Sequence, residues 1–343
     1  MKGSLAVFGQ IKGRQAAACV VDGRLDDLLI EPPENRIRPG AIYRAMAGRP
    51  MKGQGGMILD TPDGPLFLRQ SKGISAGDTL LVQVSSYAEP GKASPCTPRL
   101  LFKSRFAMVT PGAAGKNISK AVRDEERRVE LRELLDRLEM PETMGIVLRT
   151  ASEGAEDAAV EDNARAMLEL ACAILAEPLS GRPEKLLDGL SPVDLALQDW
   201  PIPDATEEGA DAFERTGTDE MVDALRSPRE NLPGGAYLFV EPTRALVSID
   251  VNTGSDTSPS AGLKANIEAM RALPRALRLR GLGGQIVVDM APLSKRDRKQ
   301  VESAARAAFR ADPIETSLVD WTPLGHLEIL RKRERLPLTE CLP

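Results

Sequence analysis

The sequence contains a single histidine, His326, and only four cysteines. A catalytic triad or a histidine-rich metal site would need partners that the chain lacks, so most histidine-based catalysis is excluded. Cys19, Cys96, Cys172 and Cys341 lie far apart without a C-x-x-C pair, so neither a zinc knuckle nor a disulfide framework is predicted. Any hydrolytic chemistry is therefore expected to depend on carboxylates.

Long apolar runs are also absent. No stretch reaches the roughly 18 residues that a membrane-spanning helix needs. The apolar part of the N-terminal stretch MKGSLAVFGQ is interrupted by Gly9 and Gln10, which is unlike a signal peptide. We therefore expect a cytoplasmic protein without membrane association. The formal net charge of -5 argues against indiscriminate binding to polyanions.

The length and the turn signals predict several domains. The chain has 343 residues, whereas single cores usually stop growing at roughly 250. Residues 1–32 alternate like strands, and residues 40–98 contain short strand candidates separated by turn signals. This pattern of short strands and turns is typical of a small β-barrel, a fold that often binds single-stranded nucleic acid.

The last third of the chain has the clearest pattern. We predict a strand over 236–251, a helix over 261–280, a strand over 284–290, a helix over 294–310 and a strand near 313–319, followed by a basic helix or tail. A strand, helix, strand order implies a crossover connection. The two strands that end in Asp250 and Asp289 should therefore run parallel and finish at the same edge of a sheet.

Asp250 and Asp289 are candidate ligands of a hydrated divalent cation. Mg²⁺ accepts one or two carboxylates, keeps several waters and leaves room for phosphate oxygens. Asn252, on the same strand face as Asp250, would support the site without adding charge. An aspartate at the end of an apolar strand is, however, most often a turn or cap residue, so that interpretation stays open for each residue taken alone.

The strand MGIVLRTAS ends in Arg149 and Thr150. One interpretation is a strand end with a surface ion pair. The other is an anion pocket, in which a guanidinium grips a phosphate and a hydroxyl adds one hydrogen bond.

The strings GGAYLFVEPTRALVSIDVNTG, NIEAMRALPRALRLRGLGGQIVVDM, MGIVLRTA and GHLEILRKR, within residues 144–333, resemble the ribonuclease E/G family of bacterial endoribonucleases. The resemblance implies that Asp250 and Asp289 bind Mg²⁺ and that Asn252 supports them. It also implies a pocket for the 5′-monophosphate of RNA. The pocket residues and two RNA-contact positions in the barrel would be Arg149, Thr150, Ser104, Met108, Phe67 and Lys92.

The resemblance further implies an α/β (α+β multidomain) fold. An RNase H-like subdomain (1–38 and 184–230) would hold an inserted S1-like β-barrel (39–98) and a 5′-sensor region (99–183). A deoxyribonuclease-I-like catalytic subdomain (231–343) would follow.

The function implied is a Mg²⁺-dependent endoribonuclease that cleaves single-stranded RNA and senses its 5′-monophosphate. A non-catalytic RNA-binding protein of the same family, or a structural scaffold, is the alternative. We expect the barrel to bind RNA weakly, because it has few aromatic residues to stack on bases. Phe67 and Tyr87 are the aromatics expected to stack there, and Ile58 stands where the resemblance implies another aromatic residue.

Family members usually continue into a zinc link that joins two protomers. Cys341 is the one cysteine near the C-terminus, so two protomers would offer two sulfurs where a structural zinc site needs four ligands. We therefore predict that any homodimer is not linked by zinc, with a monomer as the alternative.

Overall fold

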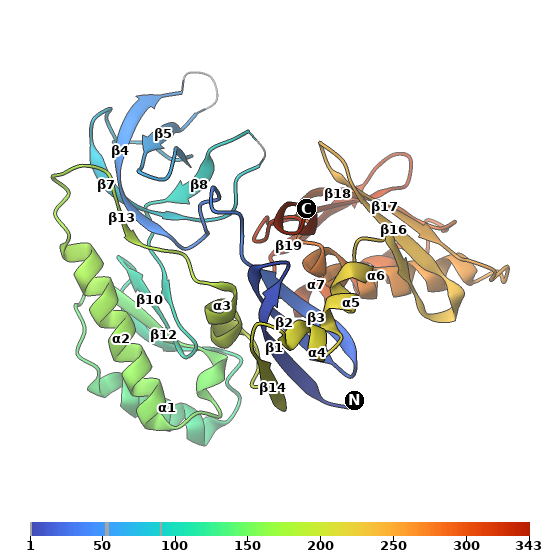
Figure 1. The fold of residues 1–343 in the computed structure, drawn as a ribbon, viewed down its shortest axis with the longest axis horizontal. Coiled ribbons are helices and arrows are strands. Elements are labelled where there is room, and N and C mark those ends of the chain that lie inside the picture. Colours follow the sequence, from blue (N-terminus) through green and yellow to red (C-terminus); the bar gives the residue numbers. More distant parts are fainter. Residues whose placement is uncertain (1, 52–54, 90) are drawn as a thin grey trace. The chain divides into compact units, whose positions relative to one another are not determined.

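The computed structural model describes residues 2–51, 55–89 and 91–343. The chain forms two compact units (Figure 1). One comprises the chain up to Pro33 together with Pro203–Pro343, and the other comprises Glu34–Ile202. Within the described residues, we find no helix with the length and apolar character that crossing a membrane would require.

The unit Glu34–Ile202 contains a closed five-stranded barrel, which confirms the barrel predicted from the turn signals. Its strands are β4 (Ile42–Pro50), β5 (Met57–Asp60), β6 (Leu66–Leu68), β7 (Thr79–Val84) and β8 (Ser94–Thr97). They follow the order β4-β5-β6-β8-β7, and pairing of β7 with β4 closes the barrel. Tyr43 is a further aromatic residue of the barrel, beyond Phe67 and Tyr87, and it lies buried in the barrel core.

The same unit contains a four-stranded sheet in the order β11-β12-β10-β9. The elements are β9 (Phe102–Lys103), β10 (Ala107–Pro111), β11 (Gly115–Ile118), α1 (Glu125–Arg137), β12 (Met144–Leu148), the 3-10 turn η1 (Thr150–Ser152) and α2 (Asp157–Ala176). Asp124 caps the N-terminus of α1, since its side chain accepts hydrogen bonds from the backbone N–H groups of Glu126 and Arg127. Apolar residues of α1 and α2 form one core with the buried positions of this sheet.

Residues 184–202 lie in this unit, although we predicted that 184–230 would join the N-terminal strands. Strand β13 (Glu184–Leu187) pairs with β4 of the barrel. Helix α3 (Pro192–Asp199) is held by Arg105, whose Nη1 donates to the carbonyl oxygens of Leu197 and Trp200. These long-range contacts decide the boundary, and no local sequence signal encodes them.

The other unit begins with a sheet in the order β14-β1-β2-β3. Its strands are β1 (Ser4–Ile11), β2 (Arg14–Val21), β3 (Arg24–Ile30) and β14 (Ala205–Glu208), and α4 (Ala212–Arg215) and α5 (Thr218–Ala224) follow. Lys12-Gly13 and Asp22-Gly23 turn the first three strands, and all four residues have positive φ. Such two-residue turns match the twist of a hairpin. Strand β14 pairs parallel to β1, so distant parts of the chain share this sheet.

The second sheet of this unit has six strands in the order β15-β16-β17-β18-β20-β19. The elements are β15 (Arg229–Asn231), η2 (Pro233–Gly235), β16 (Tyr237–Pro242), β17 (Val247–Asn252), α6 (Ala261–Leu279), β18 (Gly284–Asp289), α7 (Arg298–Ala311), β19 (Thr316–Trp321), β20 (Leu327–Arg331) and α8 (Leu338–Cys341). Apolar residues of α6 and α7 form the core with one face of the sheet. We call the opposite face, which carries Phe239, Asp250 and Asp289, the open face.

Two predictions for this region were wrong. The expected strand 236–251 is a hairpin, because Thr243 and Leu246 close a turn between β16 and β17. The expected basic helix or tail contains strand β20, which pairs with β18 and β19. Arg331 of β20 is 1% exposed, because its charge is paired with buried Asp312 instead of facing water.

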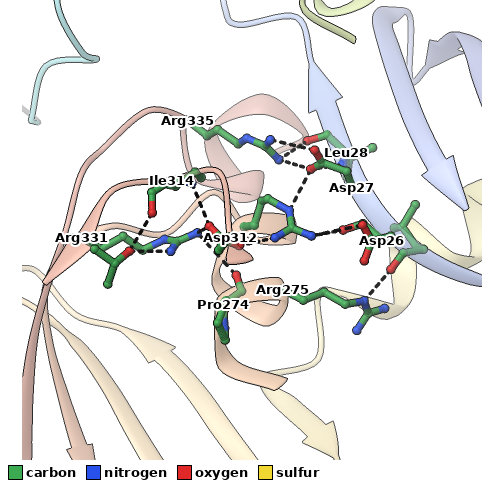
Figure 2. A network of polar contacts seen from close by, with 12 residues as sticks. Asp26, Asp27, Leu28, Pro274, Arg275, Asp312, Ile314, Arg331 and Arg335 are labelled. Atoms are coloured by element: carbon green, nitrogen blue, oxygen red, sulfur yellow. Dashed lines mark hydrogen bonds and ion pairs between the residues drawn. The ribbon is translucent and has the colours of Figure 1, made fainter. Parts of the chain in front are cut away.

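A network of ion pairs, most of them buried, joins the two sheets of this unit (Figure 2). Arg278 of α6 contacts Asp312 after α7 and also Asp26 and Asp27 of β3. Arg335 also pairs with Asp27. Burial alone would raise the pKa of Asp27, but the charges of Arg335 and Arg278 lower it below its usual value. The Asp27 carboxylate therefore stays ionised and pairs with both guanidinium groups.

Candidate active site

Strands β17 and β18 bring Asp250 and Asp289 side by side. The strands are parallel, and Asp250 pairs directly with Asp289 in the register. This confirms the prediction that both strands run parallel and end at one edge. Ile249 and Val288 are buried, whereas Asp250 and Asp289 are exposed, so both carboxylates lie on the open face. Neighbouring strands are about 4.8 Å apart, which places the two carboxylates within reach of one ion.

Asn252 lies on the same face, two residues further along β17. Its Nδ2 donates a hydrogen bond of 2.9 Å to Oδ2 of Asp250. The carboxamide therefore orients the carboxylate and adds no charge beside it. The shared strand face predicted for Asn252 and Asp250 is confirmed.

His326, the single histidine of the sequence, lies next to this pair. Its Nδ1 is 3.2 Å from Oδ1 of Asp289, within ion-pair distance, although the two groups are not aligned for a hydrogen bond. Strand β20 places it there, because Val288 pairs with Leu327 and the next position of each strand follows the same register. Recognising HLEILR as a strand, with its alternating buried positions, would have found this residue.

The donor chemistry of the site fits a hard cation. Asp250 and Asp289 offer carboxylate oxygens, which Mg²⁺ prefers, and their exposure leaves room for the waters that Mg²⁺ retains. Over residues 2–51, 55–89 and 91–343, no group of three or more His, Cys, Asp and Glu side chains is placed to hold a metal ion.

The structure brings part of the predicted phosphate pocket together in the other unit. Nη1 of Arg149 donates to the carbonyl oxygens of Ser104 and Gln198, and Nη2 lies 2.8 Å from Oδ1 of Asp199. Burial raises the pKa of Asp199, but Lys103 and Arg149 lower it more, so the carboxylate stays ionised. An intramolecular carboxylate therefore holds the guanidinium.

The other predicted pocket residues lie near this arginine in the fold. Oγ1 of Thr150 is 3.1 Å from Oγ of Ser119, and Thr150 is exposed at the start of η1. Met108 lies half-buried on β10 and pairs with Val147 of β12. The sequence did not point to Asp199, because α3 comes fifty residues later in the chain. Nor did it point to Lys103, whose amine contacts the same carboxylate.

Phe67 and Lys92 lie on the barrel surface. Phe67 is half-buried between Leu66 and Leu68, which are both buried, so its ring faces away from the barrel core. It pairs with Ile58 of β5 on that outer face. The Lys92 side chain is 69% exposed and lies 2.6 Å from Glu89. Both positions are accessible to a ligand.

Paired carboxylates with a supporting carboxamide at adjoining strand ends define a candidate site for a metal-dependent phosphoryl-transfer enzyme. The chain belongs to the ribonuclease E/G family. The model of that family matches residues 102–208 and 202–334.

The curated relatives that the chain resembles carry the names ribonuclease E and ribonuclease G. It is 28% identical to "Ribonuclease E" of Nostoc sp. (strain PCC 7120), over 96% of this chain and 54% of that protein. It is 28% identical to "Ribonuclease E" of Synechocystis sp. (strain PCC 6803), over 83% of this chain and 49% of that protein. It is 24% identical to "Ribonuclease G" of Escherichia coli (strain K12), over 95% of this chain and 79% of that protein. The chain thus spans about half the length of the two ribonuclease E proteins.

Proposed function

We propose that the protein is a Mg²⁺-dependent endoribonuclease that cleaves single-stranded RNA. The observation that carries the proposal is the register in which Asp250 and Asp289 pair on the open face of parallel strands. Membership of the ribonuclease E/G family supports it. Bound at these carboxylates, Mg²⁺ would polarise the phosphodiester and supply a nucleophile at neutral pH.

The residues of the chain have separable roles in this proposal. Asp250 and Asp289 supply the two negative charges that hold the cation. Asn252 keeps the carboxylate of Asp250 in one orientation through its 2.9 Å hydrogen bond. His326 borders Asp289 on the side of β20. Asp250 and Asp289 are exposed on the open face, which leaves their solvent side free for the RNA backbone.

This proposal is tested with the purified chain and a 5′-monophosphorylated, A/U-rich oligonucleotide. We expect cleavage with Mg²⁺ and none after the metal is chelated with EDTA. Gel analysis of an end-labelled oligonucleotide gives the rate and the cut sites. A folded protein that binds the oligonucleotide but leaves it intact with Mg²⁺ would contradict the enzyme and favour the alternative, a non-catalytic RNA-binding member of the family.

We also propose that the barrel corresponds to the S1-like part of the family and contacts RNA through Phe67 and Lys92. The N-terminal sheet would be the RNase H-like part, and the six-stranded sheet with α6 and α7 the deoxyribonuclease-I-like catalytic part. The outward ring of Phe67 and the exposed Lys92 amine support the barrel assignment. They supply one stacking surface and one phosphate contact.

Sensing of a 5′-monophosphate is proposed at Arg149, with Thr150, Ser104 and Met108 around it. The ion pair between Arg149 and Asp199 supports an anion-binding role, because a phosphate would replace the carboxylate on the same guanidinium. The 22% exposure of the Arg149 side chain leaves one side open.

Replacing Arg149 with alanine is expected to abolish any preference for a 5′-monophosphate over a 5′-hydroxyl. The lost charge-assisted hydrogen bonds predict about a tenfold fall in that preference. Thr150→Val should reduce it less, because one neutral hydrogen bond is lost. The measurement is the ratio of kcat/KM for the two substrates. Equal cleavage of both by the unaltered protein would show that Arg149 is not a sensor.

That any homodimer is not linked by zinc stays a prediction. Cys341 is 4% exposed in α8, so its thiol is buried within its own unit. We expect any homodimer to survive a strong zinc chelator, as measured by light scattering. A dimer that dissociates on losing stoichiometric zinc would contradict this.

A further inference from the structure

Two aromatic residues lie beside the candidate active site on the open face. Phe239 of β16 pairs with Asp250, and Tyr237 pairs with Asn252. Residues that pair directly across antiparallel strands point to the same face and have Cβ atoms about 4.5 to 5.5 Å apart. Both rings therefore adjoin the site on the side opposite to Asp289.

These rings are not part of the hydrophobic core. Their neighbours Leu238 and Val240 are 0% and 2% exposed and pack in the core with α6. Phe239 and Tyr237 are half-buried on the other face. Their centroids are 5.7 Å apart with the planes at 83°, so one ring edge meets the other ring. Aromatic residues form 3% of the chain, which makes a pair at the site a notable use of them.

An arginine from the edge strand extends this surface. The guanidinium carbon of Arg229 lies 4.0 Å from the centroid of the Tyr237 ring. Its Nε donates a 3.1 Å hydrogen bond to Asn231, which fixes the plane of the group. Arg229 also pairs with Phe239 in the register, so one row across the sheet contains Arg229, Phe239, Asp250 and Asp289.

We propose that Phe239, Tyr237 and Arg229 form a stacking platform for a nucleobase of the RNA, next to the phosphate that is cleaved. This inference rests on the proposed function and adds a base-binding subsite to it. Aromatic rings and guanidinium planes stack on any base, and the arginine also attracts the RNA backbone. One strand spacing, about 4.8 Å, separates the platform from Asp250, so the base of an adjoining nucleotide comes within reach.

The subsite makes the protein sensitive to the presence of a base at one position and tolerant of its identity. Every base has a π face, so stacking alone does not select among them. The platform would also compensate for a barrel in which few aromatics are available to stack.

The test measures RNA binding in EDTA, so that it does not depend on cleavage. A fluorescent single-stranded RNA is titrated with the unaltered protein and with Phe239→Leu, Phe239→Tyr and Leu330→Ala. Phe239→Leu keeps an apolar side chain but removes the ring, and we expect about a fivefold to tenfold weaker Kd. Phe239→Tyr should bind as the unaltered protein does. Leu330, 53% exposed on β20 of the same face, is the matched control and should have no effect.

A second arm locates the base. Single abasic nucleotides are placed in turn along the RNA, and one position is expected to lower the affinity of the unaltered protein by about the same factor. In Phe239→Leu that position should no longer matter, because the ring that stacks on the base is gone. Tyr237→Leu, whose lost ring faces the Arg229 guanidinium, should reproduce the effect, and thermal melting confirms that each variant is folded.

Equal affinity of Phe239→Leu and Phe239→Tyr, or an abasic effect that persists in Phe239→Leu, would overturn the platform. These outcomes are separate from failure of the proposed function. A protein that does not cleave with Mg²⁺ would fail as a nuclease, whereas the binding arms would still decide the stacking. Normal cleavage together with no dependence on Phe239 would overturn the platform alone.

Discussion

Asp289→Asn is expected to lower kcat/KM for RNA cleavage by about 10³-fold, which corresponds to roughly 4 kcal/mol of transition-state stabilisation. The substitution keeps the volume of the side chain but removes one of two negative charges proposed to hold Mg²⁺. Asp250→Asn should have a similar effect, since Asp250 pairs with Asp289 in the register. The double variant should be little worse than either single one, because the two carboxylates act as one site.

The fold and most of the RNA binding should be unchanged in these variants, since both carboxylates are exposed on the open face. Binding in EDTA and thermal melting check this directly. Asp320→Asn is the matched control, because Asp320 is exposed on the edge strand β19 and outside the row of the site. Near-normal turnover of Asp289→Asn at saturating Mg²⁺ would show that the metal assignment is wrong.

Asp312→Asn is expected to destabilise the unit of residues 1–33 and 203–343 by about 3 to 5 kcal/mol, as breaking a buried ion pair usually does. The Asp312 side chain is 1% exposed and contacts both Arg278 and Arg331. Figure 2 shows its contact with Arg331. Burial lowers the pKa of Arg331, and Asp312 opposes that shift. Without this carboxylate, the buried guanidinium groups of Arg278 and Arg331 would lose the negative charge that lies between them.

Asp26→Asn is the control for Asp312→Asn. Asp26 contacts the same arginine, with 3.3 Å between the charged atoms, but its side chain is 47% exposed. Its loss should cost less than about 1 kcal/mol, because water replaces the interaction. In a Trp200→Phe background, Trp321 is the remaining tryptophan, so its fluorescence during urea denaturation reports on this unit alone. Equal destabilisation by the two variants would contradict the role assigned to burial.

Local pattern was sufficient for several elements. The apolar run before Asp250, the amphipathic stretch over 261–280 and the second apolar run before Asp289 predicted a strand, a helix and a strand. A short crossover between parallel strands has few solutions, so the neighbouring carboxylates followed from these elements. Asn252 followed because side chains two residues apart in a strand share a face.

Contacts between distant segments were not predictable in the same way. The stretch around His326 has a strongly charged C-terminal end and was expected to form a helix or tail. It is a strand because it pairs with β18 and β19, and Arg331 at its end is paired in the interior with Asp312, nineteen residues earlier. The register of this strand against β18 places His326 beside Asp289. Likewise, Asp199 reaches Arg149 because α3 belongs to the same unit.

The amino-acid sequence by itself determined the family resemblance, the carboxylate chemistry and the parallel strand ends, because these depend on residue type and on periods of a few residues. The structure decided the register of β16 against β17, and with it the placement of Phe239 and Tyr237 beside Asp250 and Asn252. The reason is that strand register is set by turns and by cores that several segments share. The sequence of a single segment does not specify which side chains from other segments it will contact.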